Sequence, residues 1–430
     1  MVHIPAIVRV GIVFVFILLA IKRKWMLGNA FLCGALGLGV LFLMGPLAIS
    51  RSFLASMVHP KTLCLTIIVG LILVLSHSLE RSGQMARLLE SFRGLVRWPQ
   101  VNLVIFPALI GLLPMPGGAI FSAPMVKNIA RDQHLSGDHL SYVNYWFRHI
   151  WEYWWPLYPG ILLTTALANV DIWRLVFYTL PLTFVAVLAG YWPLRHVIVA
   201  SGSRGGTGGP PKALAPFFQN LAPIALVIVG GLGSGLVLSY GLTGPIRSVA
   251  KELGLIMALV VAIFWVWHGN RMAWPDRWRI IGQPAMVKML YMVASILMFK
   301  GILEDSGAVG QISQDMLNRH IALMPISMIL PFVVGVVSGI TIAFVGATFP
   351  ILISLIQGMG QSHLMLPYMM LALTSGFMGV LLSPLHLCLL LSNEYFETSL
   401  VPVYRHMRIP LVVLLATATG YFTILARTMG

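Results

Sequence analysis

Charged side chains are scarce in this sequence. Of its 430 residues, 10% are Asp, Glu, Lys or Arg, and the acidic residues number 13. A soluble domain normally has about a quarter of its residues charged. This scarcity excludes a soluble protein of this length. The 58% of hydrophobic residues and a mean hydropathy of +0.88 indicate that the lipid bilayer is its solvent.

Cysteines and enzyme motifs are also lacking. Cys33, Cys64 and Cys388 lie in apolar segments without disulfide or zinc spacing, so we interpret them as small core residues. The sequence has no H-E-x-x-H, G-x-S-x-G or Walker A motif. We therefore expect no enzyme, no metal and no cofactor, apart from sodium or a proton as a coupling ion. Without a nucleotide site, an ion gradient must drive any transport.

The shortage of acidic residues leaves a formal net charge of +15, which by itself suggests a nucleic-acid partner. The basic residues are instead dispersed singly and in small groups between apolar runs. This is the distribution that the positive-inside rule predicts for a membrane protein. We therefore expect the lipid bilayer, and not nucleic acid, as the partner.

Long apolar runs are abundant. Runs of about 20 apolar residues are long enough to cross a bilayer as a helix, and they recur along the whole chain. They predict an all-α polytopic membrane protein of about ten transmembrane helices. The predicted spans are 4–21, 27–48, 63–80, 148–168, 173–194, 217–240, 250–268, 286–304, 364–392 and 409–427. Two further apolar stretches, about 102–127 and 323–357, are too long for one helix and are interrupted midway.

Motifs of the first half recur in the second. Residues 79–83 (LERSG) return 224 positions later as 303–307 (LEDSG), and Pro156-Leu157 returns 228 positions later as Pro384-Leu385. Gly111, Gly118-Ala119 and Phe121 also recur after 228 positions, as Gly339, Gly346-Ala347 and Phe349. We therefore predict two related halves, 1–200 and 217–430, joined by a flexible linker at 201–216.

The two interrupted stretches determine the topology. If each is a re-entrant hairpin, each half crosses the membrane five times and the second half is inverted. With both termini outside a prokaryotic cytoplasmic membrane, most of the 28 lysines and arginines fall in internal loops. The first hairpin then enters from the cytoplasm and the second from outside. A pair of kinked helices is the alternative that the sequence leaves open.

The interrupted stretches and the broken helices are where we expect the chemistry. Residues 111–124 contain three prolines and three glycines, too many for a continuous helix. Irregular backbone at membrane depth is tolerated where it is buried in protein or lines a wet cavity. The spans 148–168 and 364–392 contain Pro156 and Pro384, and a broken helix exposes amides that suit an anion and carbonyls that suit sodium.

Ionisable residues near these breaks are candidates for function. His149 and Glu152 are three residues apart, so they could hand over a proton; an ion pair with Arg148 is the alternative. His386 is either a ligand contact or a satisfied core histidine. Lys300 and Glu304, one turn apart, are interpreted as a buried structural pair.

The paired stretches, 111–124 with 148–160 and 339–350 with 383–394, resemble the ion transporter superfamily. This group includes gluconate permeases, divalent anion–sodium symporters and arsenite efflux carriers, and the chain looks closest to its uncharacterised prokaryotic families. The resemblance implies a scaffold domain, a transport domain and an elevator mechanism, with substrate at the hairpin tips and helix breaks. The tips read Pro-Gly-Gly and Val-Gly-Ala, without the Ser-Asn-Thr signature of divalent anion symporters.

Together these arguments predict a secondary active transporter of a small anionic solute, coupled to protons or sodium. The predicted substrate-binding residues are Gly117, Gly118, Ser122, Pro156, Gly346, Thr348, Pro384 and His386, and the predicted ion-coupling residues are His149, Glu152 and Asn393. A cation–proton antiporter and a non-transporting membrane scaffold are the alternatives. Gly231 and Gly235 predict close helix packing, with a homodimer contact as one interpretation.

Overall fold

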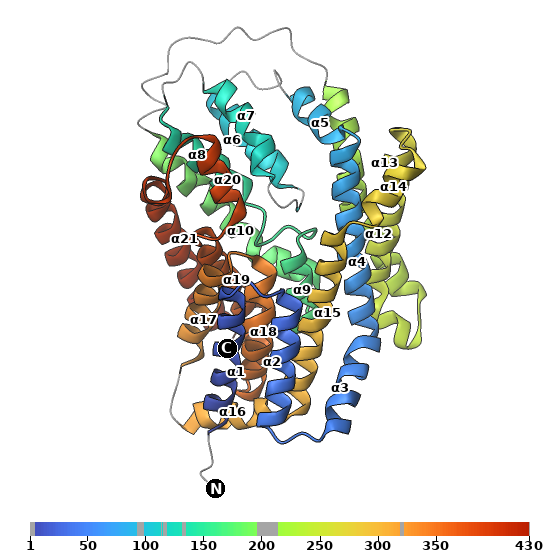
Figure 1. Cartoon of the computed structure of the whole chain (residues 1–430), viewed down its shortest axis with the longest axis vertical. Helices are drawn as coiled ribbons and strands as arrows, with labels where there is room; N and C mark the ends of the chain where they lie inside the picture. The colour runs from blue at the N-terminus through green and yellow to red at the C-terminus, as the bar shows by residue number, and fades with distance from the viewer. Residues whose placement is uncertain are drawn as a thin grey trace.

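The structure, a computed structural model, describes residues 5–92, 99–112, 114, 118–130, 135–195, 214–318 and 322–429. Every regular element in these ranges is a helix (Figure 1). The elements are α1 Ala6–Lys22, α2 Leu27–Leu41, α3 Pro46–Val58, α4 Pro60–Arg81, α5 Gln84–Phe92, α6 Pro99–Gly111, α7 Ala119–Ile129, α8 Gly137–Arg148, α9 Pro159–Ala168, α10 Ile172–Tyr191, η1 Trp192–Leu194, α12 Leu214–Gly241, η2 Gly244–Val249, α13 Ala250–Gly269, α14 Trp274–Ile281, α15 Pro284–Asp305, α16 Ala308–Asn318, α17 Leu323–Ser338, α18 Thr341–Gly358, η3 Ser362–Leu364, α19 Met365–Leu381, α20 Leu387–Tyr395 and α21 Leu400–Met429.

Eight stretches of helix in the described ranges are long and apolar enough to cross a membrane. They are Pro60–Arg81, Ile172–Leu194, Leu214–Gly241, Ile246–Gly269, Trp274–Asp305, Thr341–Gly358, Ser362–Leu381 and Leu400–Met429. The predicted all-α polytopic membrane fold is therefore confirmed.

Some predicted spans differ from the helices. The span 27–48 does not form one helix, because α2 ends at Leu41 and α3 begins at Pro46, and Leu43 between them has a left-handed backbone (φ 58°). In the span 148–168, predicted as a broken helix, α8 ends at Arg148 and regular helix resumes at Pro159. Helices α1 and α2 have 17 and 15 residues, less than a standard crossing of about 20. The long helices are therefore fewer than the ten predicted spans.

Two helices that end at the repeated L-E-x-S-G motif, α4 and α15, run in opposite directions along the bundle. Figure 1 shows α4 running toward α5 at one end of the molecule, whereas α15 runs toward α16 at the other end. Helices α6 and α7 lie in the half of the bundle near α5, and α17 and α18 lie in the half near α16. The described helices that flank the two interrupted stretches thus lie toward opposite ends of the bundle.

Matched elements of the two halves share their bounds and their turns. Helices α8, α9 and α10 begin at 137, 159 and 172, and α19, α20 and α21 begin 228 positions later, at 365, 387 and 400. Helices α4 and α15 have 22 residues each and end at the repeated L-E-x-S-G motif. Gly83 and Gly307 in this motif both have φ +68°, a conformation that glycine adopts without strain. The two-halves arrangement itself stays a prediction.

The centre of the bundle is formed by α18 and α19, whose residues are buried on nearly every side. Helices α12 and α21 bury a single stripe and expose apolar side chains elsewhere, as expected for helices that face lipid. Gly235 packs α12 against α13 of the same chain, where a Cβ on Gly254 would lie 2.3 Å from the Gly235 nitrogen. Gly231 and Gly235 are therefore not the surface of a dimer contact, and a homodimer stays a prediction.

Candidate functional site

Two helices of the described chain break inside the bundle. Helix α8 ends at Arg148, turns follow, and α9 begins at Pro159. Helix α19 ends at Leu381, and α20 begins at Leu387. Proline is tolerated in the first turn of a helix because the N–H that it lacks has no helical partner there. The first amides of α9 and α20 lack carbonyl partners within their own helices.

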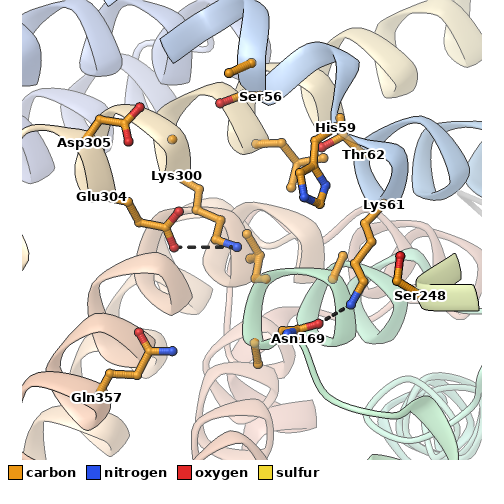
Figure 2. Close-up of a pocket in the computed structure, with 16 residues that line it drawn as sticks. Ser56, His59, Lys61, Thr62, Asn169, Ser248, Lys300, Glu304, Asp305 and Gln357 are labelled. Carbon is orange, nitrogen blue, oxygen red and sulfur yellow. Dashed lines mark hydrogen bonds and ion pairs between the residues drawn. The ribbon is translucent and has the colours of Figure 1, made fainter. Parts of the chain in front are cut away.

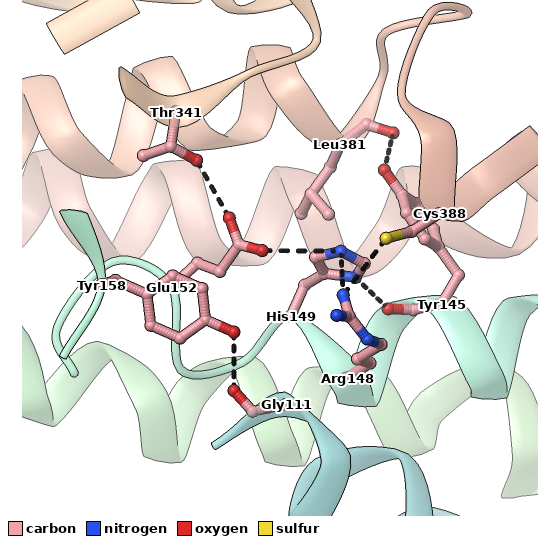
Figure 3. Close-up of polar contacts among 9 residues, drawn as sticks. All are labelled: Gly111, Tyr145, Arg148, His149, Glu152, Tyr158, Thr341, Leu381 and Cys388. Atoms are coloured by element: carbon pink, nitrogen blue, oxygen red, sulfur yellow. Dashed lines mark hydrogen bonds and ion pairs between the residues drawn. The ribbon is translucent and has the colours of Figure 1, made fainter. Parts of the chain in front are cut away.

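Arg148 is the charge at the first break, and its side chain is buried (2% exposed). Its Nη1 donates hydrogen bonds to Sγ of Cys388 and to Nε2 of His149, both at 3.2 Å (Figure 3). A buried charge is costly unless hydrogen-bonded partners surround it. We define the Arg148 cluster by the residues that gather around this side chain: Tyr145, Arg148, His149, Glu152, Thr341, His386 and Cys388.

The first interrupted stretch packs directly on Arg148. A Cβ on Gly118 would lie 2.5 Å from Nη2 of Arg148, and a Cβ on Gly111 would lie 2.0 Å from its carbonyl oxygen. The Tyr158 hydroxyl donates to the Gly111 carbonyl at 2.6 Å (Figure 3). A Cβ at Gly111 would meet rigid backbone, whereas one at Gly118 would displace the guanidinium. The two glycines therefore let the backbone of the stretch pack against both the main chain and the side chain of Arg148.

The second interrupted stretch reaches the same cluster through Glu152. The Thr341 hydroxyl, at the start of α18, donates to Oε2 of Glu152 at 2.9 Å. The other oxygen, Oε1, lies 3.6 Å from Nε2 of His149. A Cβ on Gly160 would lie 2.6 Å from Cγ2 of Thr341, so α9 and α18 meet closely here. Glu152 is therefore the carboxylate between the first break and the second interrupted stretch.

Three rings enclose the other side of the cluster. The His149 and His386 rings are perpendicular, with centroids 4.8 Å apart, and the Tyr145 ring lies 4.7 Å from His149 and 5.3 Å from His386. Nδ1 of His149 donates to the Tyr145 carbonyl at 2.6 Å. This bond leaves Nε2 as the acceptor for Arg148. Among the described residues, Nδ1 of His386 is buried without a hydrogen-bond partner, so it can take one from a ligand.

Four helix N-termini of the described chain lie at or beside this cluster. Gly118 precedes α7 and touches Arg148, Thr341 begins α18 and binds Glu152, His386 precedes α20, and Gly160 near the start of α9 touches Thr341. Each N-terminus carries about half a positive charge and unpaired amides. Together with the Arg148 guanidinium they create a strongly positive site, in which Glu152 is the negative group.

The metal-ligating atoms of the cluster are His149, His386 and Cys388, whose donor atoms lie within 4.8 Å of one another. A Cys-His-His set suits zinc or copper(I). However, Arg148 already donates to both Cys388 Sγ and His149 Nε2. A metal cation would have to displace a buried guanidinium, so the arrangement favours an anionic ligand.

A network of neutral polar groups lies next to the cluster. The Asn144 amide donates to the Ala119 carbonyl at 3.0 Å and to the Ser392 hydroxyl at 2.8 Å, and the Ser141 hydroxyl donates to Oδ1 of Asn393 at 2.6 Å. These bonds hold α7, α8 and α20 together. The Asn393 amide nitrogen is buried without a partner in the structure.

The structure brings together four predicted site residues, Gly118, His149, Glu152 and His386. Ser122 and Asn393 lie beside them; the Ser122 hydroxyl donates to the Ala119 carbonyl at 3.3 Å. Gly117 lies outside the described residues.

Four other predicted residues do not join the cluster. Gly346 packs against Ile296 of α15, and the Thr348 hydroxyl donates to Phe344 of its own helix at 2.8 Å. Pro156 is buried against another cavity, and Pro384 is exposed. The two prolines lie at the helix breaks, but their rings are not part of the Arg148 cluster.

Sequence reasoning missed several members of the cluster. The sequence offered Arg148 only as an alternative ion-pair partner of His149 and Glu152, and Cys388 was interpreted as a small core residue. The spacing of Arg148, His149 and Glu152 on one broken helix was a usable signal, because charges inside an apolar segment are costly. No sequence signal pointed to Thr341 or Tyr145, which are common residue types in a membrane helix.

A cavity of about 660 Å³ lies elsewhere, between the ends of α3, α4, α9 and α15 (Figure 2). Nζ of Lys300 lies 3.7 Å from Oε1 of Glu304, and Nζ of Lys61 donates to Oδ1 of Asn169. The Glu304 side chain is 49% exposed. The Lys300–Glu304 pair therefore forms as predicted but lines an open cavity instead of being buried.

The fold and the site define a class: a polytopic α-helical membrane protein with a charged cluster buried between two helix breaks. Residues 10–424 match the family described as Protein of unknown function (DUF401), and the chain belongs to this family. No curated protein matches the chain.

Proposed function

We propose that this protein is a secondary active transporter of a small anionic solute, and that the solute binds at the Arg148 cluster. The observation that carries the proposal is that Arg148 and four helix N-termini lie within or beside one buried cluster. Such a convergence stabilises an anion, because amides, guanidinium and helix dipoles all present positive charge. A scaffold protein has no need for a buried guanidinium at two helix breaks.

Glu152 provides a physical basis for coupling to protons. Its carboxylate neutralises part of the positive field of the cluster. When the carboxylate is protonated, the site gains one unit of positive charge and binds an anion more tightly. Solute and proton then bind cooperatively and cross the membrane together, which is symport. His149 Nε2, 3.6 Å from Glu152, is the group that exchanges this proton.

The arrangement of the helices supports alternating access. One group of helices, α2, α4, α12, α13 and α15, packs mainly on itself. A second group is formed by α6, α7, α8 and α20, and a third by α17, α18, α19 and α21. Helices α9 and α18 contact α4 and α15 between these groups, and the cavity of Figure 2 lies at this boundary. We infer an inverted repeat in which the helices around the cluster move as a transport domain against a scaffold of α2, α4, α12, α13 and α15.

Transport in liposomes tests the proposal. Purified protein is first screened by thermal shift against carboxylates, sugar acids and inorganic oxyanions, since a ligand raises stability by mass action. Anions that raise the melting temperature are then followed as uptake under a proton or sodium gradient. Arg148→Gln should lower uptake about 100-fold or more, because the solute loses its charged partner. Arg174→Gln, an exposed arginine, should transport normally.

Two results would contradict this function. Wild-type protein that binds and transports none of the anions under either gradient would exclude it. Equal uptake by Arg148→Gln and wild type, with both proteins folded by size-exclusion chromatography, would exclude the Arg148 cluster as the site.

The pH dependence of Glu152→Gln tests the coupling. The wild type should bind the anion more tightly as the pH falls, because protonation of Glu152 removes a competing negative charge. Glu152→Gln resembles the protonated state, so its affinity should be high and independent of pH, while proton-driven accumulation is lost. Binding of a cation in place of the anion, with a cation affinity that falls as the pH decreases, would instead favour a cation–proton antiporter, in which cation and proton compete for Glu152.

A further inference from the structure

A second cluster of metal-ligating side chains lies away from the Arg148 cluster. Asp138 and His139 are in the first turn of α8, and His406 is in the second turn of α21. Asp138 precedes Arg148 by ten residues, which is about 15 Å along a helix. The proposed transport mechanism does not use this cluster.

The three side chains converge closely. Nε2 of His406 lies 2.7 Å from Oδ2 of Asp138, and the His139 and His406 rings lie 4.1 Å apart. One donor atom from each residue lies within 4.8 Å of the others. Two imidazoles and a carboxylate this close present three ligand atoms to one ion.

Surrounding bonds orient the ligands. The Ser136 hydroxyl and Nδ1 of His139 are 2.7 Å apart, which holds one ring nitrogen and leaves Nε2 of His139 for a ligand. Such a hydrogen bond to the second nitrogen is typical of histidines that bind metals. The Asp138 and His406 side chains are 26% and 18% exposed, so an ion can reach them and keep water ligands.

The buried His149–His386–Cys388 set differs from this cluster in its charged partners. There, Arg148 occupies two of the three donor atoms. In the described part of the chain, no ion pair joins Asp138 to a lysine or an arginine. The partner of Asp138 is His406, 2.7 Å away, and a metal ion can take the place of the proton between these two side chains.

We propose that Asp138, His139 and His406 bind a divalent transition-metal ion of the zinc type that bridges α8 and α21. Two imidazoles and one carboxylate are a common zinc donor set, with the remaining position taken by water. Tetrahedral binding at about 2.0–2.2 Å from each donor separates the donors by about 3.3 Å. Oδ2 of Asp138 and Nε2 of His406 are now 2.7 Å apart, and all three donor atoms lie within 4.8 Å of one another. Rotation of the side chains is therefore sufficient to bring the donors to the separation that the ion requires.

Metal binding to the purified full-length protein tests this proposal. Cobalt(II) serves as a spectroscopic probe and zinc is titrated in competition, in detergent without chelator. We expect one equivalent of metal, and a rise in melting temperature that depends on metal concentration. His406→Ala and Asp138→Asn should each weaken binding at least about tenfold and abolish this rise.

Two controls separate this site from others. Cys388→Ser removes a donor of the buried set, and His363→Ala removes an exposed histidine of η3; both should bind metal as the wild type does. His406→Gln keeps a hydrogen-bond donor for Asp138 and serves if His406→Ala does not fold. Binding unchanged in His406→Gln and Asp138→Asn, or lost in Cys388→Ser alone, would overturn the proposal. None of these outcomes depends on transport.

Discussion

The two helix breaks share a backbone plan but differ in chemistry. Helices α8 and α19 start 228 positions apart, and the following helices do the same. At matched positions, however, Arg148 corresponds to Gly376 and Glu152 to Val380. A Cβ on Gly376 would lie 2.4 Å from the Phe344 ring, so this position serves close packing of α18 and α19. The comparison shows that one break carries the charges while the other supplies tight packing and neutral partners.

The backbone contact at Arg148 offers the strongest test of this comparison. Gly111→Val places side-chain atoms against the Arg148 carbonyl, which a Cβ would already approach to 2.0 Å. Backbone cannot yield as a flexible side chain does, so we expect the variant not to fold. Fluorescence-detected size-exclusion chromatography should show little or no monodisperse protein. Gly233→Val has open space at its Cβ and should elute as the wild type does; a folded Gly111→Val would refute the contact.

The next largest effect on stability is expected when a charge is placed at the second helix break. Val380→Glu puts a carboxylate at the position matching Glu152, where the side chain is fully buried and packed among apolar neighbours. An uncompensated buried charge costs about 3–5 kcal/mol, so the melting temperature should fall by many degrees. Val380→Leu keeps the position apolar and should lower it much less. Equal stability of the two variants would mean that the two breaks are electrostatically equivalent.

Thr341 links the two halves through Glu152, and its removal should have a moderate effect. Thr341→Val is close in shape but lacks the hydroxyl that donates to Glu152 at 2.9 Å. A hydrogen bond to a charged group contributes about 1.5–3 kcal/mol. We expect that loss in thermal or denaturant unfolding, and recovery of most of it in Thr341→Ser. A Thr341→Ser variant as unstable as Thr341→Val would point to packing instead of the hydrogen bond.

The smallest expected effect is at the start of α10. Partial burial would raise the pKa of Asp171, but hydrogen bonds from Lys251 and from the Arg174 and Trp173 amides lower it below its usual value. The carboxylate therefore stabilises the fold above its ordinary pKa of about 3.9, and this contribution is lost as the pH falls through the lower folded value.

Asp171→Ala should cost about 1 kcal/mol at neutral pH, with the difference from wild type shrinking below about pH 4. The matched residue in the second half is Ser399, which has no charge, so Ser399→Ala should show no such pH dependence. The same measurement of unfolding against pH for both variants checks this. A constant difference for Asp171→Ala across pH 3–7 would contradict the charged interaction.

Local features of the chain were enough to predict much of the fold. Apolar runs such as 63–80 and 217–240 predicted long helices, because the bilayer requires about 20 apolar residues per crossing, and the structure has helices at Pro60–Arg81 and Leu214–Gly241. Prolines and glycines predicted the interruptions near Gly111 and Pro384. The turn between α2 and α3 was missed, since Leu43 adopts a left-handed backbone in a stretch that is apolar throughout.

The sequence by itself determined the class of protein, the positions of the helix breaks and three members of the buried cluster, His149, Glu152 and His386. These depend on composition and on residues near one another in the chain. Only the tertiary structure decided that Arg148 is buried against Cys388, that Thr341 binds Glu152, and that Gly346 and Thr348 contact Ile296 and Phe344 instead of the cluster. Contacts between residues about 190 to 240 positions apart depend on how helices pack, and a single sequence does not record that packing.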